Sequence, residues 1–141
     1  MTVLVESRLR LEPDVLAVRA LGGWLREAAL VLDPAAAAAL LARAELAVHE
    51  ACINVIDHAG APPGTTIDLD LVLEEDRLTV RVSDRGAAFD LGAVPVPEAG
   101  AVQERGFGVK IIRSLVDELS YRRTGSGNEL ELAFDLGGPR G

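Results

Sequence analysis

The sequence predicts an α+β fold: a two-layer α/β sandwich in which a mixed, mostly antiparallel sheet is covered by helices on one face. Three observations predict it. Several segments alternate apolar and polar residues as strands do, others carry helical apolar spacing, and the elements follow in the order β-α-α-β-β-loop-α-β-β. The chain has 141 residues, 49% of them hydrophobic, with no repeat or linker, so we expect one domain spanning residues 1–141.

The first strand and the first helix are predicted near the N-terminus. Residues 2–12 are rich in β-branched side chains and roughly alternate, which is typical of a strand. Pro13 suits the first turn of a helix, and the apolar spacing that follows predicts a helix continuing to about Leu32.

A second helix and two strands are predicted next. Asp33 is a good N-cap and Pro34 a good first helical residue, and the helix should run to about Ala59, before a glycine and two prolines. Residues 65–75 and 77–84 alternate strictly, which predicts two strands with one buried and one exposed face.

The last third of the chain begins with a long segment without periodicity. Residues 85–106 are rich in Gly, Ala and Pro, and loops of this length in compact domains are often functional lids. A third helix is predicted over 107–119, followed by strands at 120–124 and 128–136.

Composition excludes several classes of function. A net charge of −8 argues against sequence-independent binding to DNA or RNA, which depends on neutralising phosphates. No apolar run is long enough to cross a membrane, and the N-terminus lacks the apolar core of a signal peptide. The single cysteine, Cys52, cannot form an internal disulfide, so we expect a cytoplasmic protein.

The second predicted helix carries a polar stripe within "ELAVHEACINVIDHAG". Glu50, Asn54, Asp57 and His58 return to nearly one azimuth of the helix. Such a stripe is often only a solvent-facing surface. If it instead faces a cleft, Asn54 could bind a hard cation through its amide oxygen and Glu50 could serve as a base.

Glycines accompany polar residues at three later points. In "VSDRGAAFD", Asp84 at a strand end could accept from an exocyclic amino group, although Asp-x-Gly is often only a turn. In "ERGFGVKIIRSL", two glycines immediately before a helix would leave free N–H groups for phosphates, or simply mark a loop-to-helix junction. Lys110, the only lysine, would suit a bound polyphosphate by its charge. In "TGSGNELEL", a glycine turn precedes a strand, which is also ordinary hairpin chemistry.

The order of these motifs is far more specific than any one of them. Glu-x-x-x-Asn on a helix, two strands, Asp-x-Gly, a long loop, Gly-x-Gly opening a helix and Gly-Asn entering a last strand resembles the Bergerat-fold (GHKL) ATPases. The small size and the phrases "HEACINVIDHAG" and "DRGAAFD" resemble the anti-sigma-factor serine/threonine kinases of the RsbW and SpoIIAB kind. The resemblance covers nearly the whole chain.

The resemblance implies a site for ATP and Mg²⁺ under a lid at about residues 87–105. Glu50 would be the general base, Asn54 would bind Mg²⁺, and Asp84 would read the adenine amino group. Arg105 replaces the small residue of many relatives and could itself touch a phosphate, whereas the role of Lys110 rests on its charge alone. The nucleotide-binding residues implied or inferred are Asn54, Asp57, His58, Asp84, Gly86, Arg105, Gly106, Phe107, Gly108, Val109, Lys110, Gly127 and Asn128.

The implied function is an anti-sigma factor with kinase activity. It would sequester a sigma factor, phosphorylate a STAS-type anti-anti-sigma partner, and make no direct contact with nucleic acid or membrane. A homodimer formed through the first strand and helix is a further expectation. The alternative is a non-catalytic, nucleotide-dependent protein-binding switch with the same fold. The presence of Glu50, Asn54 and Asp84 together with the glycines favours the kinase.

Overall fold

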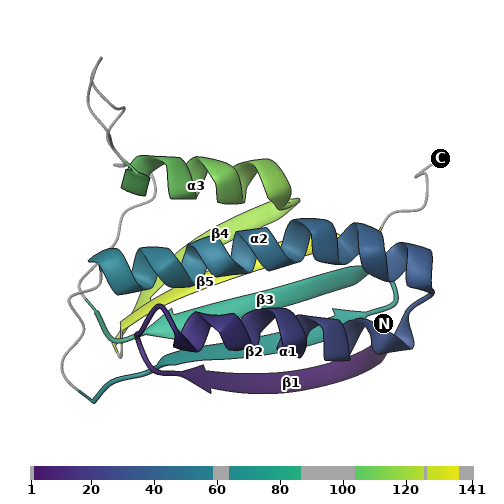
Figure 1. The fold of residues 1–141 in the computed structure, drawn as a ribbon, viewed down its shortest axis with the longest axis horizontal. Helices are drawn as coiled ribbons and strands as arrows, with labels where there is room; N and C mark the ends of the chain where they lie inside the picture. The colour runs from purple at the N-terminus through teal and green to yellow at the C-terminus, as the bar shows by residue number, and fades with distance from the viewer. Residues whose placement is uncertain (1, 59–63, 87–103, 126, 137–141) are drawn as a thin grey trace.

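The structure, a computed structural model, describes residues 2–58, 64–86, 104–125 and 127–136 (Figure 1). Three α-helices, two short 3₁₀ helices and five strands make up these ranges. In chain order they are β1 (Val3–Leu11), η1 (Ala17–Arg19), α1 (Ala20–Ala28), η2 (Ala29–Val31), α2 (Pro34–His58), β2 (Ile67–Glu74), β3 (Arg77–Asp84), α3 (Glu104–Leu115), β4 (Glu118–Thr124) and β5 (Gly127–Asp135).

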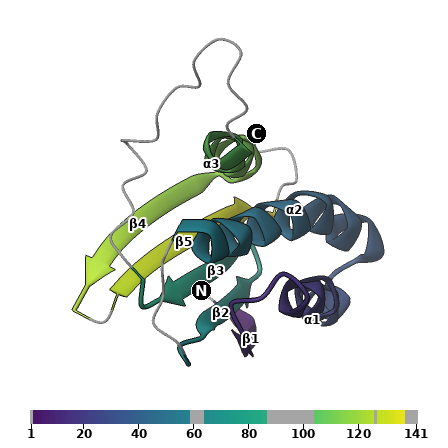
Figure 2. The same cartoon turned by 60° about the vertical axis from the view of Figure 1, so that its left-hand side comes forward.

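The strands form one sheet in the order β1-β2-β3-β5-β4, with all three α-helices on one of its faces (Figure 2). This confirms the predicted α+β sandwich. Every pairing among the described strands is antiparallel, so the mixed sheet that we predicted is wholly antiparallel there. The connections explain the antiparallel pairing. Two helical segments lie between β1 and β2, and two elements, α3 and β4, lie between β3 and β5, so in both cases the chain returns in the opposite direction.

The core lies between the sheet and the helices. Side chains of β2 and β3 alternate between buried and partly exposed along their whole length, as the sequence predicted. The inward residues of these strands meet buried residues of α1, α2 and α3. The largest fully buried side chains are Phe134, Leu25, Ile67, Leu69, Leu71, Leu73, Ile112, Leu132, Val18, Val48, Val80 and Val82.

The outer face of the sheet carries ion pairs that link β1 to β2 and, separately, link β3, β5 and β4. Arg8 of β1 pairs with Asp70 of β2 at 2.9 Å. Arg81 of β3 pairs with Glu129 of β5 at 3.3 Å, and Arg122 of β4 pairs with the same carboxylate at 2.8 Å. These pairs are partly or largely exposed, so each contributes at most about 1 kcal/mol. The charged side chains make this face polar, as expected of a sheet face that is open to solvent.

The first helical segment begins later than predicted. The sequence predicted a helix from Pro13, but the carboxylate of Asp14 accepts the backbone N–H of Leu16 at 2.8 Å and holds the chain in a turn. A 3₁₀ turn follows, and α1 itself spans only Ala20–Ala28. The second helix begins as predicted, because Asp33 accepts the N–H of Ala36 at 3.2 Å as an N-cap.

The third helix also differs in its bounds. It was predicted over 107–119 but spans Glu104–Leu115. After its end, the N–H of Asp117 bonds to the carbonyl of Ala133 at 2.8 Å, so the chain joins the sheet earlier than the apolar pattern indicated. Strand β4 therefore begins at Glu118.

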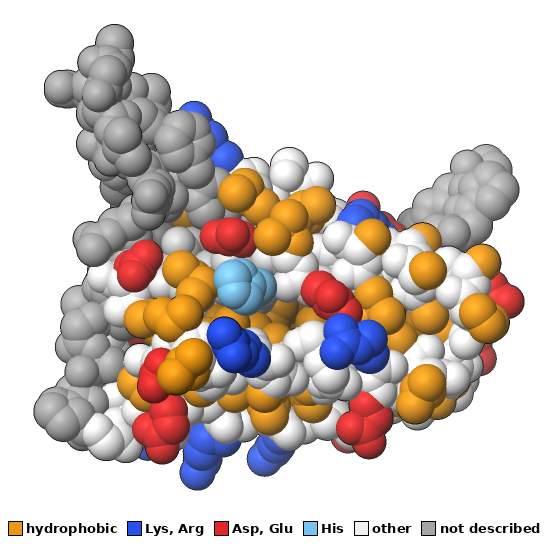
Figure 3. All heavy atoms as spheres, viewed as in Figure 1, with side chains coloured by type: hydrophobic (Ala, Val, Ile, Leu, Met, Phe, Trp, Pro, Cys, Tyr) orange, Lys and Arg blue, Asp and Glu red, His pale blue; other side chains and the backbone are white. Residues whose placement is uncertain are grey.

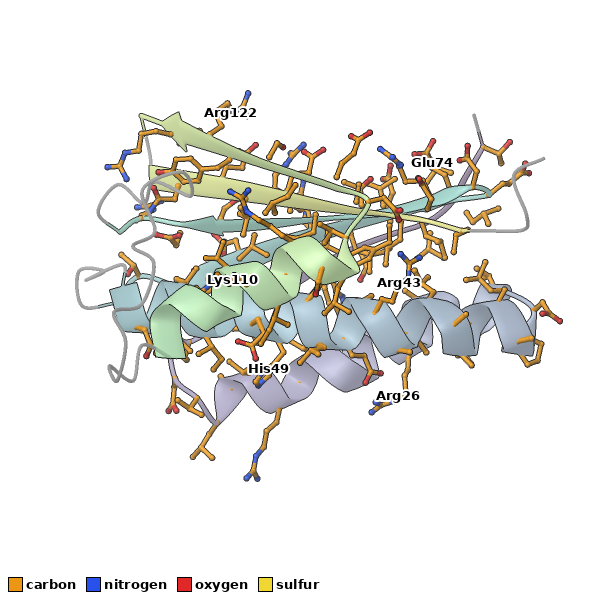
Figure 4. The ribbon with its side chains drawn as sticks, turned by 90° about the horizontal axis from the view of Figure 1, so that it is seen from above. Arg26, Arg43, His49, Glu74, Lys110 and Arg122 are labelled. Carbon is orange, nitrogen blue, oxygen red and sulfur yellow. The ribbon has the colours of Figure 1, made fainter. Side chains whose placement is uncertain are left out.

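Arg43 ties the two layers together at the end of the molecule where α3 and β5 finish. Its guanidinium reaches from α2 toward the sheet (Figure 4). It donates to the carbonyl of Leu115 at 3.4 Å, to Asp117 Oδ2 at 3.1 Å and to the carbonyl of Asp135 at 2.8 Å. It also lies 5.9 Å from the centre of the Phe134 ring.

The helical face presents hydrophobic side chains to solvent over α1 and α2, interspersed with charges (Figure 3). Val15, Leu30 and Leu46 are 61%, 79% and 45% exposed. A groove of about 550 Å³ runs between η1–α1 and α2. No helix within the described ranges combines the length and hydropathy needed to span a bilayer.

Candidate functional site

Four segments that carried the predicted site residues meet at one end of the molecule. They are the C-terminal turns of α2, the end of β3, the start of α3 and the start of β5 (Figure 1). Their arrangement follows from the topology, because α2 and β3 finish at the same end at which α3 and β5 begin.

Asp84 and Asn128 form a buried polar pair at the ends of β3 and β5. The two residues are opposite each other in the sheet register and are 8% and 6% exposed. Asp84 Oδ1 accepts the N–H of Gly86 at 2.6 Å and the side-chain amide of Asn128 at 3.0 Å. No described residue donates to Asp84 Oδ2. That oxygen keeps contact with solvent, because every fully enclosed side-chain N or O atom in the described ranges has a partner.

Gly127 allows the close approach of these two strands. Its φ of +149° is one that side-chain-bearing residues rarely adopt, and a Cβ atom at this position would lie 1.9 Å from the Asp84 carbonyl oxygen. The family resemblance assigned Asp84, Gly86, Gly127 and Asn128 to one nucleotide site, and the structure brings these four residues together.

Asn54 and Glu50 lie one turn apart on α2. Asn54 is 8% exposed, and its amide makes no hydrogen bond to any other residue that the structure describes. Because no fully enclosed polar atom in those ranges lacks a partner, the amide retains solvent contact. Glu50 is half-buried. A largely buried amide oxygen that accepts from no described residue fits the ligand that a hard cation needs.

Asp57 and His58 occupy the last turn of α2. Asp57 is exposed, so the structure does not place it in the buried part of the stripe. His58 is the final residue of the helix, and its side chain lies outside the described part of the structure. The polar stripe is thus buried at Asn54, half-buried at Glu50 and open to solvent by Asp57.

The start of α3 differs from the prediction. The sequence placed Gly106 and Gly108 before the helix, but α3 begins at Glu104, so both glycines lie within its first turns. The free N–H groups of a helix are its first four, so Arg105, Gly106 and Phe107 lie in that segment and Gly108 follows it. Their side chains, and lid residues 87–103, lie outside the described residues.

Val109 and Lys110 of α3 point in different directions. Val109 is 3% exposed and belongs to the core, so only its backbone could serve a ligand. Lys110 is exposed and lies in the second turn of the helix, whereas the sequence placed it in the first (Figure 4).

Tyr121 and Arg123 of β4 were not predicted from the sequence. The Tyr121 hydroxyl donates to Asn128 Oδ1, and Arg123 donates to the same oxygen at 3.1 Å. Arg123 also donates to the carbonyl of Gly86 at 2.6 Å. The only sequence signal was the Tyr-x-Arg spacing, which puts both side chains on one face of a strand.

Cys52 lies two residues before Asn54 but cannot act as a nucleophile. Its side chain is fully buried, and burial raises the pKa of the thiol from 9.0 to about 12. The thiolate required for attack is therefore absent at neutral pH, and the residue serves packing.

A cleft of about 310 Å³ opens at the same end of the sheet. Its lining includes the site residues Asp84, Gly127 and Asn128. It also includes Thr66, Asp68, Ser83 and Glu129, and of these Asp68 and Ser83 alternate with the inward residues of their strands and so lie on the outer face. A ligand held by Asn54 would lie on the opposite, helix-covered face.

A family model supports the motif-based prediction. The model described as "Histidine kinase-like ATPase domain" matches residues 11–134 of this chain. The serine-protein kinase RsbW of Halalkalibacterium halodurans is 36% identical over 86 residues, covering 55% of this chain and 52% of the relative. The serine-protein kinase RsbW of Bacillus cereus strain AH187 is 31% identical over 83 residues, covering 53% and 52%. The chain spans about half the length of these curated relatives.

Two solved structures share the fold. The RsbU and RsbW domains of Rv1364c from Mycobacterium tuberculosis match with a TM-score of 0.62 at 18% identity, covering 92% of this chain and 32% of that chain. The histidine kinase domain of the blue-light activated histidine kinase from Erythrobacter litoralis EL346 matches with a TM-score of 0.52 at 21% identity, covering 82% and 61%. Together with the sequence matches, these confirm the resemblance that the motifs predicted.

Proposed function

Because this chain belongs to the histidine kinase-like ATPase domain family, we propose that it is an ATP-binding protein serine/threonine kinase that acts as an anti-sigma factor. The name of the curated relatives, serine-protein kinase RsbW, supports a serine as the phosphoryl acceptor. The proposed partners are a sigma factor, which the protein sequesters, and a STAS-type anti-anti-sigma protein, which it phosphorylates in the cytoplasm.

The observation that carries the proposal is that two largely buried polar side chains, Asn54 and Asp84, lie at the same end of the molecule. Asn54 on α2 has an amide in a residue only 8% exposed that bonds to no described residue, and Asp84 on β3 has one carboxylate oxygen without a described donor. Both groups lie on the helix-covered side of the sheet and keep contact with solvent, which a bound ligand would replace. A ligand that presents a cation at one end and an amino group at the other would satisfy both.

ATP with Mg²⁺ is such a ligand. Asp84 would accept from the exocyclic amino group of adenine, while Gly86 and Gly127 leave room for the base beside the backbone. The first N–H groups of α3, at Arg105, Gly106 and Phe107, would face the phosphates. When bound, Mg²⁺ supplies charge neutralisation on the phosphates, and Asn54 is the residue that would hold it.

Glu50 is the proposed base for the transfer. The serine or threonine hydroxyl oxygen would form a bond to the γ-phosphorus of ATP while the bond from that phosphorus to the β–γ bridging oxygen breaks. ADP leaves, and the hydroxyl proton passes to Glu50. Glu50 is half-buried one turn from Asn54, so its carboxylate is accessible from the same side of α2.

Titration calorimetry with ATP, with and without Mg²⁺, tests the nucleotide site. We expect the wild type to bind ATP with Mg²⁺, and Asn54→Ala to lose the Mg²⁺-dependent part of the affinity. His49→Ala, an exposed change on the same helix, is the matched control and should bind like the wild type. Equal affinity in the wild type and Asn54→Ala would refute the cation assignment.

Phosphoryl transfer to a STAS-domain protein separates the kinase from its alternative. Glu50→Gln should retain ATP affinity but lose transfer of labelled γ-phosphate. If the wild type binds ATP but phosphorylates no serine or threonine of its partner, the protein is instead the non-catalytic, nucleotide-dependent switch.

A further inference from the structure

We propose that Arg123 and Tyr121 hold the amide of Asn128 in one orientation and so make the nucleotide site selective for adenine over guanine. The inference rests on the proposed nucleotide binding and deepens it. Both residues belong to the edge strand β4, and neither motif matching nor the family resemblance pointed to them.

The register of β4 places the two residues on the side of the sheet where the nucleotide would bind. Arg123 is opposite Asn128 and Tyr121 is opposite Leu130, so both share the face of Asp84. Arg122, between them, points to the outer face and pairs with Glu129. Neighbouring arginines of one strand therefore have different surroundings, which provides a matched control.

The guanidinium of Arg123 determines which way the Asn128 amide points. An arginine side chain has donors and no acceptor, so the Asn128 atom 3.1 Å from it must be the amide oxygen. The Tyr121 hydroxyl is a second donor to that oxygen. The NH₂ group must then face Asp84, and it donates to Asp84 Oδ1 at 3.0 Å. The two ends of an Asn amide are usually hard to tell apart, but here the donor-only guanidinium of Arg123 identifies the oxygen.

The orientation of Asn128 fixes in turn what Asp84 offers to a base. With Oδ1 occupied by Asn128 and by the N–H of Gly86, only Oδ2 remains as an acceptor. Adenine presents an amino group at its 6-position and can donate to that oxygen. Guanine presents a carbonyl oxygen there, which would oppose the carboxylate without a hydrogen. If the Asn128 amide were flipped, its oxygen would face Asp84 and the hydrogen bond to Oδ1 would be lost. The Asp84 carboxylate would then no longer be held in the orientation that presents Oδ2 to the base.

Arg123 also holds the backbone that follows Asp84. Its donation to the Gly86 carbonyl at 2.6 Å links β4 to the segment that would lie along the base. The Arg123 guanidinium donates to the side-chain oxygen of Asn128 and to the backbone carbonyl of Gly86, and no described acidic side chain forms an ion pair with it. The contrast with Arg122 indicates that Arg123 serves the polar pair rather than the surface charge pattern.

The test compares ADP and GDP affinities by calorimetry for the wild type and four variants. Arg123→Met keeps the side-chain bulk but removes both donors, so the ratio of ADP to GDP affinity should fall at least about tenfold. Arg123→Lys retains a donor and should restore part of the ratio, and Tyr121→Phe should lower it less than Arg123→Met. Arg122→Met should leave the ratio unchanged.

A second readout needs no nucleotide. In ¹⁵N-correlated NMR spectra, the Asn128 side-chain NH₂ should exchange slowly with water in the wild type and in Arg122→Met, and faster in Arg123→Met. The inference would be overturned if Arg123→Met had the same ratio of ADP to GDP affinity as the wild type, including the case in which it binds both nucleotides equally more weakly. Neither result would affect the proposed function. A wild type that binds neither nucleotide would overturn the proposed function together with the selectivity.

Discussion

The backbones of Gly127 and Asp84 approach so closely that a Cβ atom on residue 127 would stand 1.9 Å from the Asp84 carbonyl oxygen. No side chain fits at that distance, and the local φ of +149° favours glycine independently. The glycine therefore sets the spacing between the ends of β3 and β5, where Asp84 and Asn128 meet.

Gly127→Ala should destabilise the fold by about 2–4 kcal/mol and weaken ADP binding, because strain and overpacking add. Urea unfolding followed by the fluorescence of Trp24 measures the change. This residue is the only tryptophan, and its indole N–H bonds to Ser7 across α1 and β1 at 2.8 Å. Gly125→Ala, where a Cβ meets nothing within 4 Å, is the control and should change stability by less than about 0.5 kcal/mol. Equal stabilities of the two variants would contradict the close approach.

Arg43→Met should lower the free energy of unfolding by about 1–3 kcal/mol. The change leaves the carbonyls of Leu115 and Asp135 without their guanidinium donor and removes an ion pair with Asp117. Arg26→Met is the matched control on α1, because its exposed pair with Glu45 should contribute less than about 1 kcal/mol. A loss no larger in Arg43→Met than in Arg26→Met would show that the link between layers is not a stabilising one.

The buried thiol of Cys52 should make stability fall at alkaline pH. Below pH 9.0 both folded and unfolded chains hold the thiol proton. Between pH 9.0 and about 12 only the unfolded chain releases it, so unfolding is favoured as pH rises, by up to about 1.4 kcal/mol per pH unit. Urea titrations of the wild type and Cys52→Ala across this range should show a steeper decline for the wild type. In addition, a thiol reagent at pH 8 should label the wild type only in urea.

The strands and helix caps could be predicted because their causes are local. Alternation along residues 67–74 and again along 77–84 places every second side chain of each strand in the core, and Asp33 caps the helix that follows it. The late start of α1 could not be predicted, because Asp14 competes with the helix for a nearby backbone N–H. The early end of α3 also has a remote cause, the bond from Asp117 to Ala133 in the sheet.

The candidate site shows the same division. Glycines and acids in a distinctive order could be recognised along the chain, and Asp84 and Asn128 do meet. The roles of Arg123 and Tyr121 depend on the register of the β4–β5 hairpin, which sets Arg123 opposite Asn128, and on the side of the sheet that their side chains share with Asp84. The predicted contributions of Glu50, Asn54 and the residues of α3 to nucleotide binding remain predictions.

The outer face of the sheet keeps well-exposed charges on both edge strands. On β1 the side chains of Arg8 and Arg10 are 90% and 75% exposed, and on β4 those of Arg122 and Glu118 are each 70% exposed. Charged side chains on an edge strand oppose its pairing with a strand of another molecule, because that pairing would take their charges out of water. These residues therefore also protect the two open edges of the sheet from aggregation. The expected homodimer would more readily meet through α1 or the apolar start of β1.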